Sequence, residues 1–295
     1  MPLILPHGLP AAETLRREGA VLPPAAPEGV RPLRVLLLNL MPQKAVTELD
    51  FARMLCGCSE WVELIPVKIR GQRYKTTPQA HMDRYYTDID AFEADGADGL
   101  IVTGAPVEHL PFEQVRYWPQ LCRIMDWAQR RVRSTLYVCW GAQAALYHRY
   151  GIAKHGLPAK MFGIFAQNVL APEEPLFDGI GSPFAMPNSR HTEVRAAEFP
   201  ADAGLRLVAA SSESGAGVAV ADGGRAIFDV GHLEYAPLTL ETEWRRDQAK
   251  GLPIEMPRHY YHADSPEAGV DYSWREAALR FYANWITHYV APGRR

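Results

Sequence analysis

The sequence has few cysteines, little excess charge and no long apolar run, and each of these features excludes a class of protein. Four cysteines in 295 residues are too few for a disulfide scaffold. A formal net charge of −3 gives no overall attraction to nucleic acid or to an anionic membrane. No apolar run reaches the roughly 20 residues that cross a bilayer, and residues 1–10 lack the basic and apolar regions of a secretory signal. We therefore expect a cytoplasmic protein without nucleic-acid or membrane partners.

Motifs for metals and nucleotides are also missing. The chain has no His-Glu-x-x-His or similarly dense ligand spacing, no Gly-x-x-x-x-Gly-Lys loop, and no Gly-x-Gly-x-x-Gly after a strand. Cys56 and Cys58 have no matching pair of Cys or His for a zinc knuckle. We therefore expect no metal site and no nucleotide-dependent chemistry.

What the first half does contain is an alternation of apolar strands and amphipathic helices. Strands are expected at 33–40, 61–67, 99–104 and 135–139, and helices at 45–55, at 114–131 with a kink or restart at Pro119, and from 140 to about 150. Residues 70–85 are polar and suit a surface excursion. This alternation predicts βαβ crossovers and a parallel sheet with helices on both faces.

The second half is richer in β structure, and a proline-rich arm precedes the first strand. Further strands are expected at 160–165, 205–211, 217–221 and 225–230, with a tight turn at 222–224 between the last two. We divide the chain into an arm, residues 1–32, with a short helix at 11–18, and a single α/β domain, residues 33–295. The arm carries apolar residues that a monomer would have to cover, so we expect a homodimer through it. The alternative is that the arm packs across its own domain.

One stretch, residues 134–146, looks like a nucleophile elbow. A β-favouring run stops at Cys139, and the small residues Gly141 and Ala142 follow at once. A cysteine at such a turn meets free N–H groups and the positive end of the helix dipole, which favour a thiolate. The alternative is a buried cysteine that packs as a small hydrophobic residue, and this stretch alone does not decide between the two.

Residues that act together with Cys139 are expected near the carboxyl ends of the strands, where parallel sheets bind ligands. The loops that hold Lys44, Glu108 and Cys139 should share one rim of the sheet. His232 and Glu234 follow the hairpin, and in extended chain residues two apart project to the same face. An imidazole with a carboxylate beside it is what a thiolate nucleophile needs, although His-x-Glu alone is a weak signal.

Five stretches together carry a resemblance to a known family. They are Leu-Asn-Leu-Met-Pro-Gln-Lys at 38–44, Val-Thr-Gly-Ala-Pro-Val-Glu at 102–108, Tyr-Val-Cys-Trp-Gly-Ala-Gln-Ala at 137–144, Asn-Ser-Arg-His at 188–191 and Gly-His-Leu-Glu-Tyr at 231–235. From about residue 30 to the C-terminus the chain resembles the homoserine O-acyltransferases of methionine biosynthesis. The resemblance implies a flavodoxin-like fold of the class I glutamine-amidotransferase type.

The resemblance also implies site residues. Cys139, His232 and Glu234 would form a catalytic triad that passes an acyl group from acyl-CoA to an amino-acid hydroxyl by a ping-pong route. The backbone N–H of Trp140 would be an oxyanion donor. Three residues would contact the amino-acid substrate, namely Lys160, Ser189 and Arg246.

The acyl donor depends on Glu108, which matches a glutamate of acetyl-using members where succinyl-using members have glycine. Acetyl-CoA is therefore expected as co-substrate, with no bound cofactor, and homoserine O-succinyltransferase activity is an alternative. Departures from the family pattern at Ala166, Gln167, Leu233 and Ala236 leave serine open as acceptor beside homoserine. A glutamine-amidotransferase-like hydrolase and a non-catalytic binding module also stay open.

Overall fold

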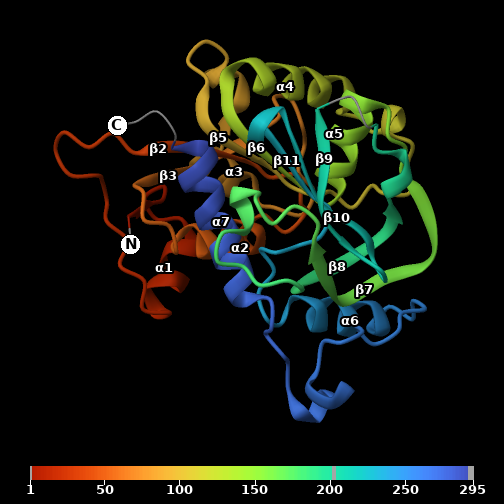
Figure 1. Cartoon of the computed structure of the whole chain (residues 1–295). Coiled ribbons are helices and arrows are strands. Elements are labelled where there is room, and N and C mark those ends of the chain that lie inside the picture. The colour runs from red at the N-terminus through yellow and green to blue at the C-terminus, as the bar shows by residue number, and fades with distance from the viewer. Residues whose placement is uncertain (1, 201–203, 292–295) are drawn as a thin grey trace.

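The computed structural model describes residues 2–200 and 204–291 (Figure 1). Its helices are α1 (Pro10–Arg17), α2 (Lys44–Leu55), α3 (Gln79–Tyr85), α4 (Trp118–Arg131), α5 (Trp140–Tyr150), α6 (Thr239–Ala249) and α7 (Arg275–Trp285). Its strands are β1 (Leu3–Ile4), β2 (Leu33–Leu38), β3 (Val62–Lys68), β4 (Thr87–Asp88), β5 (Ala97–Val102), β6 (Val132–Val138), β7 (His155–Val169), β8 (Phe184–Glu193), β9 (Leu205–Ser211), β10 (Gly215–Ala221) and β11 (Ala226–Asp229).

The strands form one sheet in the order β1-β3-β2-β5-β6-β11-β10-β9-β7-β8, with β4 beside β3. The pairs from β3 through β2, β5 and β6 to β11 are all parallel. The chain therefore starts its parallel sheet at β2, places β3 on one side and β5 and β6 on the other, which is the flavodoxin-like order. The predicted α/β fold with a parallel sheet is confirmed.

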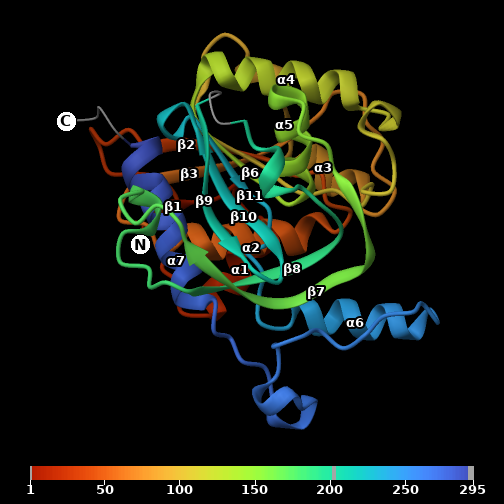
Figure 2. The same cartoon turned by 45° about the vertical axis from the view of Figure 1, so that its right-hand side comes forward.

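Helices cover both faces of the sheet (Figures 1 and 2). They do so because the central strands point apolar side chains toward each face. Val35 and Leu37 of β2 belong to a buried cluster with residues of α1, α2 and α7. Leu36 and Leu38 point the other way into a second cluster with residues of α4 and α5. A strand that is buried on both faces has no polar side, which explains the unbroken apolar run at 35–38.

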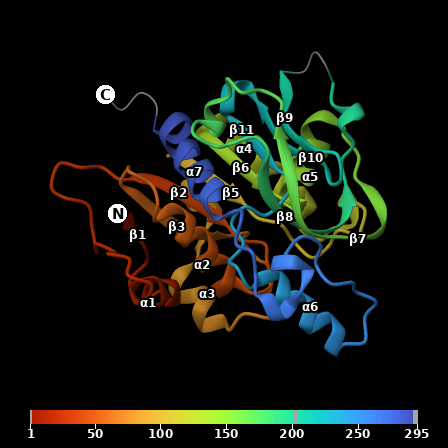
Figure 3. The same ribbon diagram turned by 60° about the horizontal axis from the view of Figure 1, so that its bottom comes forward.

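The antiparallel end of the sheet differs from expectation. Strand β7 runs for 15 residues and pairs with β8 along one side and with β9 at its end. Neither β8 nor the short helix α3 was predicted. The predicted restart at Pro119 is present, because a 3₁₀ turn at Phe112–Gln114 ends before α4 starts at Trp118 with Pro119 in its first turn. The hairpin of β7 and β8 lies beside α6, so the two enclose one side of the sheet's carboxyl edge (Figures 2 and 3).

The arm packs on its own domain. Strand β1 pairs with β3 in parallel, and Leu3, Leu9 and Leu15 are buried in the monomer. The premise that Leu3 and Leu9 are exposed is therefore wrong, because the edge of the sheet and α2 cover the start of the arm, whereas Val21 and Val30 further along it are exposed. The homodimer itself stays a prediction. Among the described helices, none combines the length and the apolar character needed to cross a membrane.

Candidate active site

Cys139 lies at the sharp turn between β6 and α5, as the elbow interpretation predicted. Its backbone has φ 52° and ψ −117°, which an L-residue adopts only under strain. The turn is held because the Cys139 N–H donates to Asp229 O at 2.7 Å. Behind it, a Cβ on Gly141 would lie 2.7 Å from the carbonyl oxygens of Val102 and Thr103, so only glycine lets the helix start this close to β5.

His232 faces Cys139 and is held from behind by Glu234. The Nδ1 atom of His232 lies 2.7 Å from Glu234 Oε1, and both side chains are buried. The second ring nitrogen, Nε2, is left for Cys139, with which His232 also shares a hydrogen bond. The three predicted triad residues therefore come together.

The predicted reason for the His232–Glu234 contact was wrong. Residues 232–235 form a turn, in which the Tyr235 N–H donates to His232 O at 3.2 Å, and not an extended strand. The turn brings the two side chains to the same side as an extended chain would. Its position is set by β8, because the His232 N–H donates to Pro187 O at 2.9 Å.

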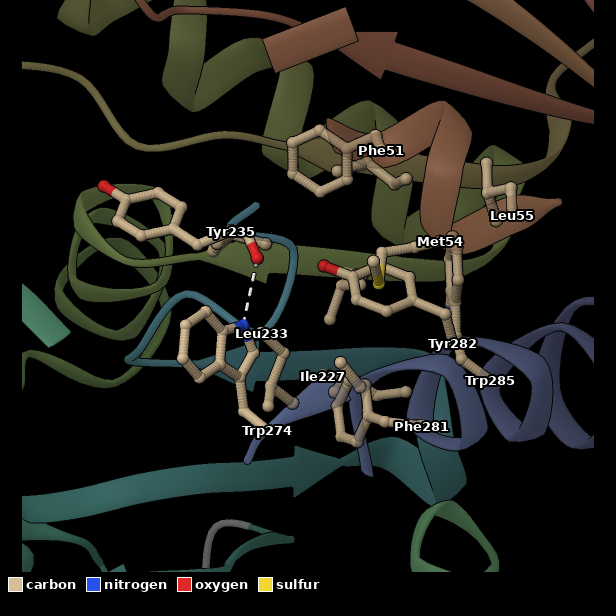
Figure 4. Packing of buried hydrophobic residues seen from close by; sticks show 14 of the residues in the cluster. Phe51, Met54, Leu55, Ile227, Leu233, Tyr235, Trp274, Phe281, Tyr282 and Trp285 are labelled. Carbon is tan, nitrogen blue, oxygen red and sulfur yellow. Dashed lines mark hydrogen bonds between the residues drawn. The ribbon is translucent and has the colours of Figure 1, made fainter. Parts of the chain in front are cut away.

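The imidazole plane is fixed by Tyr235. The two rings stack with centroids 4.1 Å apart and planes 14° apart. The backbone of Tyr235 is anchored to the core in turn, since Trp274 Nε1 donates to Tyr235 O at 2.9 Å and Leu233 is fully buried near it (Figure 4). The packed core thus determines the orientation of the histidine.

The charges around His232 favour its protonated form. Burial lowers its pKa, but the nearby Cys139 and Glu234 and the hydrogen bonds to both outweigh burial, so the pKa of His232 is raised well above its usual value. Arg190, also buried, lies close enough to Cys139 to interact with it electrostatically. Its guanidinium donates to neutral oxygens of Asn188, Thr192 and Ser214, so these bonds leave its positive charge in place.

Two further buried carboxyl groups lie behind the triad, and neither was predicted. Burial, followed by the charge of Glu234, raises the pKa of Asp50 on α2 to about 8 and that of Asp229 at the end of β11 to about 7. Glu234 Oε2 and Asp229 Oδ2 have no hydrogen-bond partner among the described residues. Three carboxyl groups that share one dry region cannot all ionise easily, which holds protons on Asp50 and Asp229 near neutral pH.

The triad opens into a cavity of about 180 Å³ at the carboxyl edge of the sheet. Besides Cys139, Trp140 and His232, the predicted residues that line it are Glu108, Lys160, Ser189 and Arg246. The Trp140 N–H belongs to the first turn of α5, where helical N–H groups have no partner within the helix. Gly104 borders the same spot, since a Cβ there would lie 3.8 Å from Cys139 Sγ.

One lining residue that was missed, Glu243 of α6, organises the polar side of this cavity. Ser189 Oγ donates to Glu243 Oε2 at 2.6 Å, and Lys160 Nζ lies 3.0 Å from the same oxygen. The Tyr235 hydroxyl donates to Glu243 Oε1 at 3.2 Å. Arg246, one turn further along α6, pairs through Nε and Nη2 with Asp247. Only the fold could reveal this carboxylate, because in the sequence it is one of three acidic residues in α6 and nothing distinguishes it from Glu241.

Lys44 does not line the cavity. It is 2% exposed, and its ammonium group donates to the carbonyl oxygens of Asn39 and Met41, at 2.5 and 2.9 Å. Since Met41 and Pro42 do line the cavity, Lys44 holds the loop that forms one wall. Its role as active-site support stays a prediction.

The model of the homoserine O-succinyltransferase family matches residues 2–293. A protein named homoserine O-acetyltransferase from Bacteroides fragilis is 48% identical over 293 residues, covering 98% of this chain and 96% of its own. One of the same name from Desulfitobacterium hafniense is 41% identical, covering 98% of this chain and 95% of its own.

Solved structures resemble the fold at low identity. A glutamine amidotransferase from Thermotoga maritima superposes with a TM-score of 0.56 at 12% identity, covering 87% of this chain and 96% of that one. A glutamine amidotransferase from Methylobacillus flagellatus gives 0.54 at 15%, covering 88% and 95%. These likenesses confirm the class I glutamine-amidotransferase-like architecture, and the match along nearly the whole sequence shows that this chain belongs to the homoserine O-succinyltransferase family.

Proposed function

We propose that the protein is a homoserine O-acetyltransferase that uses acetyl-CoA as donor and a covalent Cys139 thioester as intermediate. The observation that carries this proposal is the shared cavity, in which a buried Cys-His-Glu arrangement meets polar groups suited to an amino acid and is bordered by Glu108. The relatives named homoserine O-acetyltransferase support the acetyl donor.

In the first half-reaction, His232 Nε2 takes the proton of Cys139, and Sγ attacks the thioester carbonyl carbon of acetyl-CoA. The positive charges of His232 and Arg190 stabilise the thiolate. The negative oxygen of the tetrahedral intermediate accepts from the Trp140 N–H, with a second donor from the loop at Gly104, and one such donor contributes about 3 kcal/mol. Collapse breaks the bond to the CoA sulfur, which takes the proton from His232.

In the second half-reaction, His232 takes the proton of the acceptor hydroxyl, and the hydroxyl oxygen attacks the acetyl-thioester carbon. The same donors bind the second oxyanion, and collapse releases the ester and the Cys139 thiolate, which shares the proton of His232. In both steps Glu234 accepts a hydrogen bond from Nδ1–H of His232, so Nε2 always faces the reacting groups.

The cavity offers groups of both signs for an amino acid. Glu243 can bind the α-ammonium group in place of Lys160 or Ser189, which now contact it. The pairing of Arg246 with Asp247 uses Nε and Nη2, so Nη1 is left for the α-carboxylate. The four family departures at Ala166, Gln167, Leu233 and Ala236 are absent from the lining of this cavity. This favours homoserine over serine as acceptor.

Release of free CoA from acetyl-CoA, with homoserine, serine or glutamine added in turn, tests the proposal. We expect turnover with homoserine, and O-acetylhomoserine identified by mass spectrometry. Faster turnover with serine would assign a serine O-acyltransferase, succinyl-CoA as better donor would assign an O-succinyltransferase, and ammonia from glutamine would assign a hydrolase. The absence of any reaction would favour a non-catalytic binding module.

All four cysteines are free, which supports a cytoplasmic location, where thiols stay reduced.

A further inference from the structure

Three potential metal ligands meet at the mouth of the cavity. Glu108 and His109 lie in the loop after β5, and His191 lies on β8. One carboxylate oxygen and one nitrogen from each imidazole lie within 4.8 Å of one another. The two imidazole rings are 4.9 Å apart between centroids. The fold brings them together across a long stretch of sequence, so no ligand motif announces them.

These side chains are available to a ligand. Within residues 2–200 and 204–291, Glu108, His109 and His191 make no side-chain hydrogen bond or ion pair with the protein. Other histidines do pair with carboxylates, namely His81, His148 and His155. The negative charges of Glu108 and Asp247 act on His191 and offset the positive charge of Lys160. His109 is exposed and the other two are partly exposed, so their torsions can adjust.

We propose that Glu108, His109 and His191 form a binding site for a divalent transition-metal ion, with Zn²⁺ as the best fit. Imidazole nitrogens favour Zn²⁺ over Mg²⁺ or Ca²⁺, which prefer oxygen ligands. Tetrahedral Zn²⁺ with bonds of about 2.0–2.2 Å holds its ligand atoms roughly 3.4 Å apart, so the three groups close in by a modest side-chain rotation. Three protein ligands leave the fourth position to water.

Bound metal inhibits acyl transfer, a consequence that rests on the proposed function. Glu108 and His191 both line the catalytic cavity and also the adjoining groove of about 510 Å³. An ion that joins them places itself and its water at the edge of the catalytic cavity that receives the acyl group. His109 lines the groove but not the catalytic cavity, so it contributes a ligand without touching the reaction.

Binding is measured first, without substrates, by titrating the full chain with ZnCl₂ against a chromophoric chelator. The variants are His109→Ala, Cys139→Ser and, as a matched exposed histidine outside the site, His262→Ala. We expect one Zn²⁺ per chain in the wild type, in His262→Ala and in Cys139→Ser, and an affinity at least about tenfold weaker in His109→Ala. Mg²⁺ at the same concentrations should not compete. Co²⁺ should give visible d–d bands without a thiolate charge-transfer band.

Inhibition is then measured on CoA release. His109→Ala should keep the rate of the wild type without metal but need at least about tenfold more Zn²⁺ for half inhibition, whereas His262→Ala should match the wild type. Unchanged Zn²⁺ affinity in His109→Ala would overturn the site, and so would loss of binding in Cys139→Ser, because the metal would then lie on the nucleophile. Since binding is read without turnover, failure of the proposed acyl transfer would not hide either result.

Discussion

The replacement Glu108→Gly tests the link between the cavity and the choice of acyl donor. Glu108 is half-buried and lines the cavity that contains Cys139. A succinyl thioester on Cys139 would carry its free carboxylate toward this glutamate. We expect the variant to shift its preference from acetyl-CoA toward succinyl-CoA.

The size of the shift follows from the charges and the small space. Two carboxylates about 4 Å apart repel by about 4 kcal/mol at an effective dielectric of 20 and by about 1 kcal/mol in bulk water. Because Glu108 is partly exposed, solvent screens it and the lower figure is the safer one. Even about 1 kcal/mol changes the preference roughly fivefold. Loss of the side chain also enlarges a cavity of only about 180 Å³, so size acts in the same direction as charge.

The assay is the ratio of kcat/KM for succinyl-CoA to kcat/KM for acetyl-CoA, with homoserine as acceptor. Glu108→Gln separates the two causes, because it removes the charge and keeps the volume. Glu113→Gln serves as the matched control, since Glu113 lines the neighbouring groove but not the catalytic cavity. We expect the ratio to rise most in Glu108→Gly, less in Glu108→Gln, and not at all in the control.

An unchanged ratio in Glu108→Gly, in a protein that still folds and turns over acetyl-CoA, would refute the reasoning. The loop backbone should survive the change, because Lys154 Nζ donates to the backbone oxygens of Glu108 and Leu110. A ratio that rises equally in the control would point to a general field effect at the cavity mouth and not to contact with the acyl group.

Three further predictions concern the elbow and the groups behind it. Cys139→Ser should abolish turnover. Intact-protein mass spectrometry after acetyl-CoA alone should show a single acetyl adduct on the wild type and none on the variant; an equal adduct on the variant would exclude Cys139 as nucleophile. Gly141→Ala should lower the free energy of unfolding by about 1–3 kcal/mol, because its Cβ would meet Thr103 O at 2.7 Å, whereas Gly156→Ala, which meets nothing within 4 Å, should change it little in the same urea titration. Burial, and then the charge of Glu234, raises the pKa of Asp229 from 3.8 to about 7, so the folded state holds a proton that the unfolded state releases. The contribution of Asp229 to the free energy of unfolding should therefore fall as pH rises from 4 to 7. Asp229→Asn should remove this contribution and make the slope of the free energy against pH more positive than in the wild type, and equal slopes in the two proteins would contradict this.

Local sequence was enough wherever one short stretch determines the structure. The fully apolar run 35–38 requires a strand buried on both faces, and β2 contains it. The position of Cys139 between a β-favouring run and Gly141 predicted the elbow. The structure gives the reason for the glycine, because only a small residue lets the helix start against Val102 and Thr103. Local patterns also pointed to His232 and Glu234, whereas Lys160, Ser189 and Arg246 were named from the family resemblance. The fold brings these three residues into one cavity with Cys139 and His232.

Other features were decided only by tertiary contacts. Strand β8 contains Pro187 and Asn188, which disfavour strands, and it forms because it pairs along β7. Glu243 and Asp229 look like ordinary acidic residues in the sequence, and the fold alone turns one toward the cavity and buries the other behind the triad. The sequence of the arm is the same whether its leucines pack against a partner or against their own domain. The pairing of β1 with β3 decided that they pack against their own domain. In each case the deciding interaction joins residues that are far apart in the chain. No short stretch of sequence therefore reveals it.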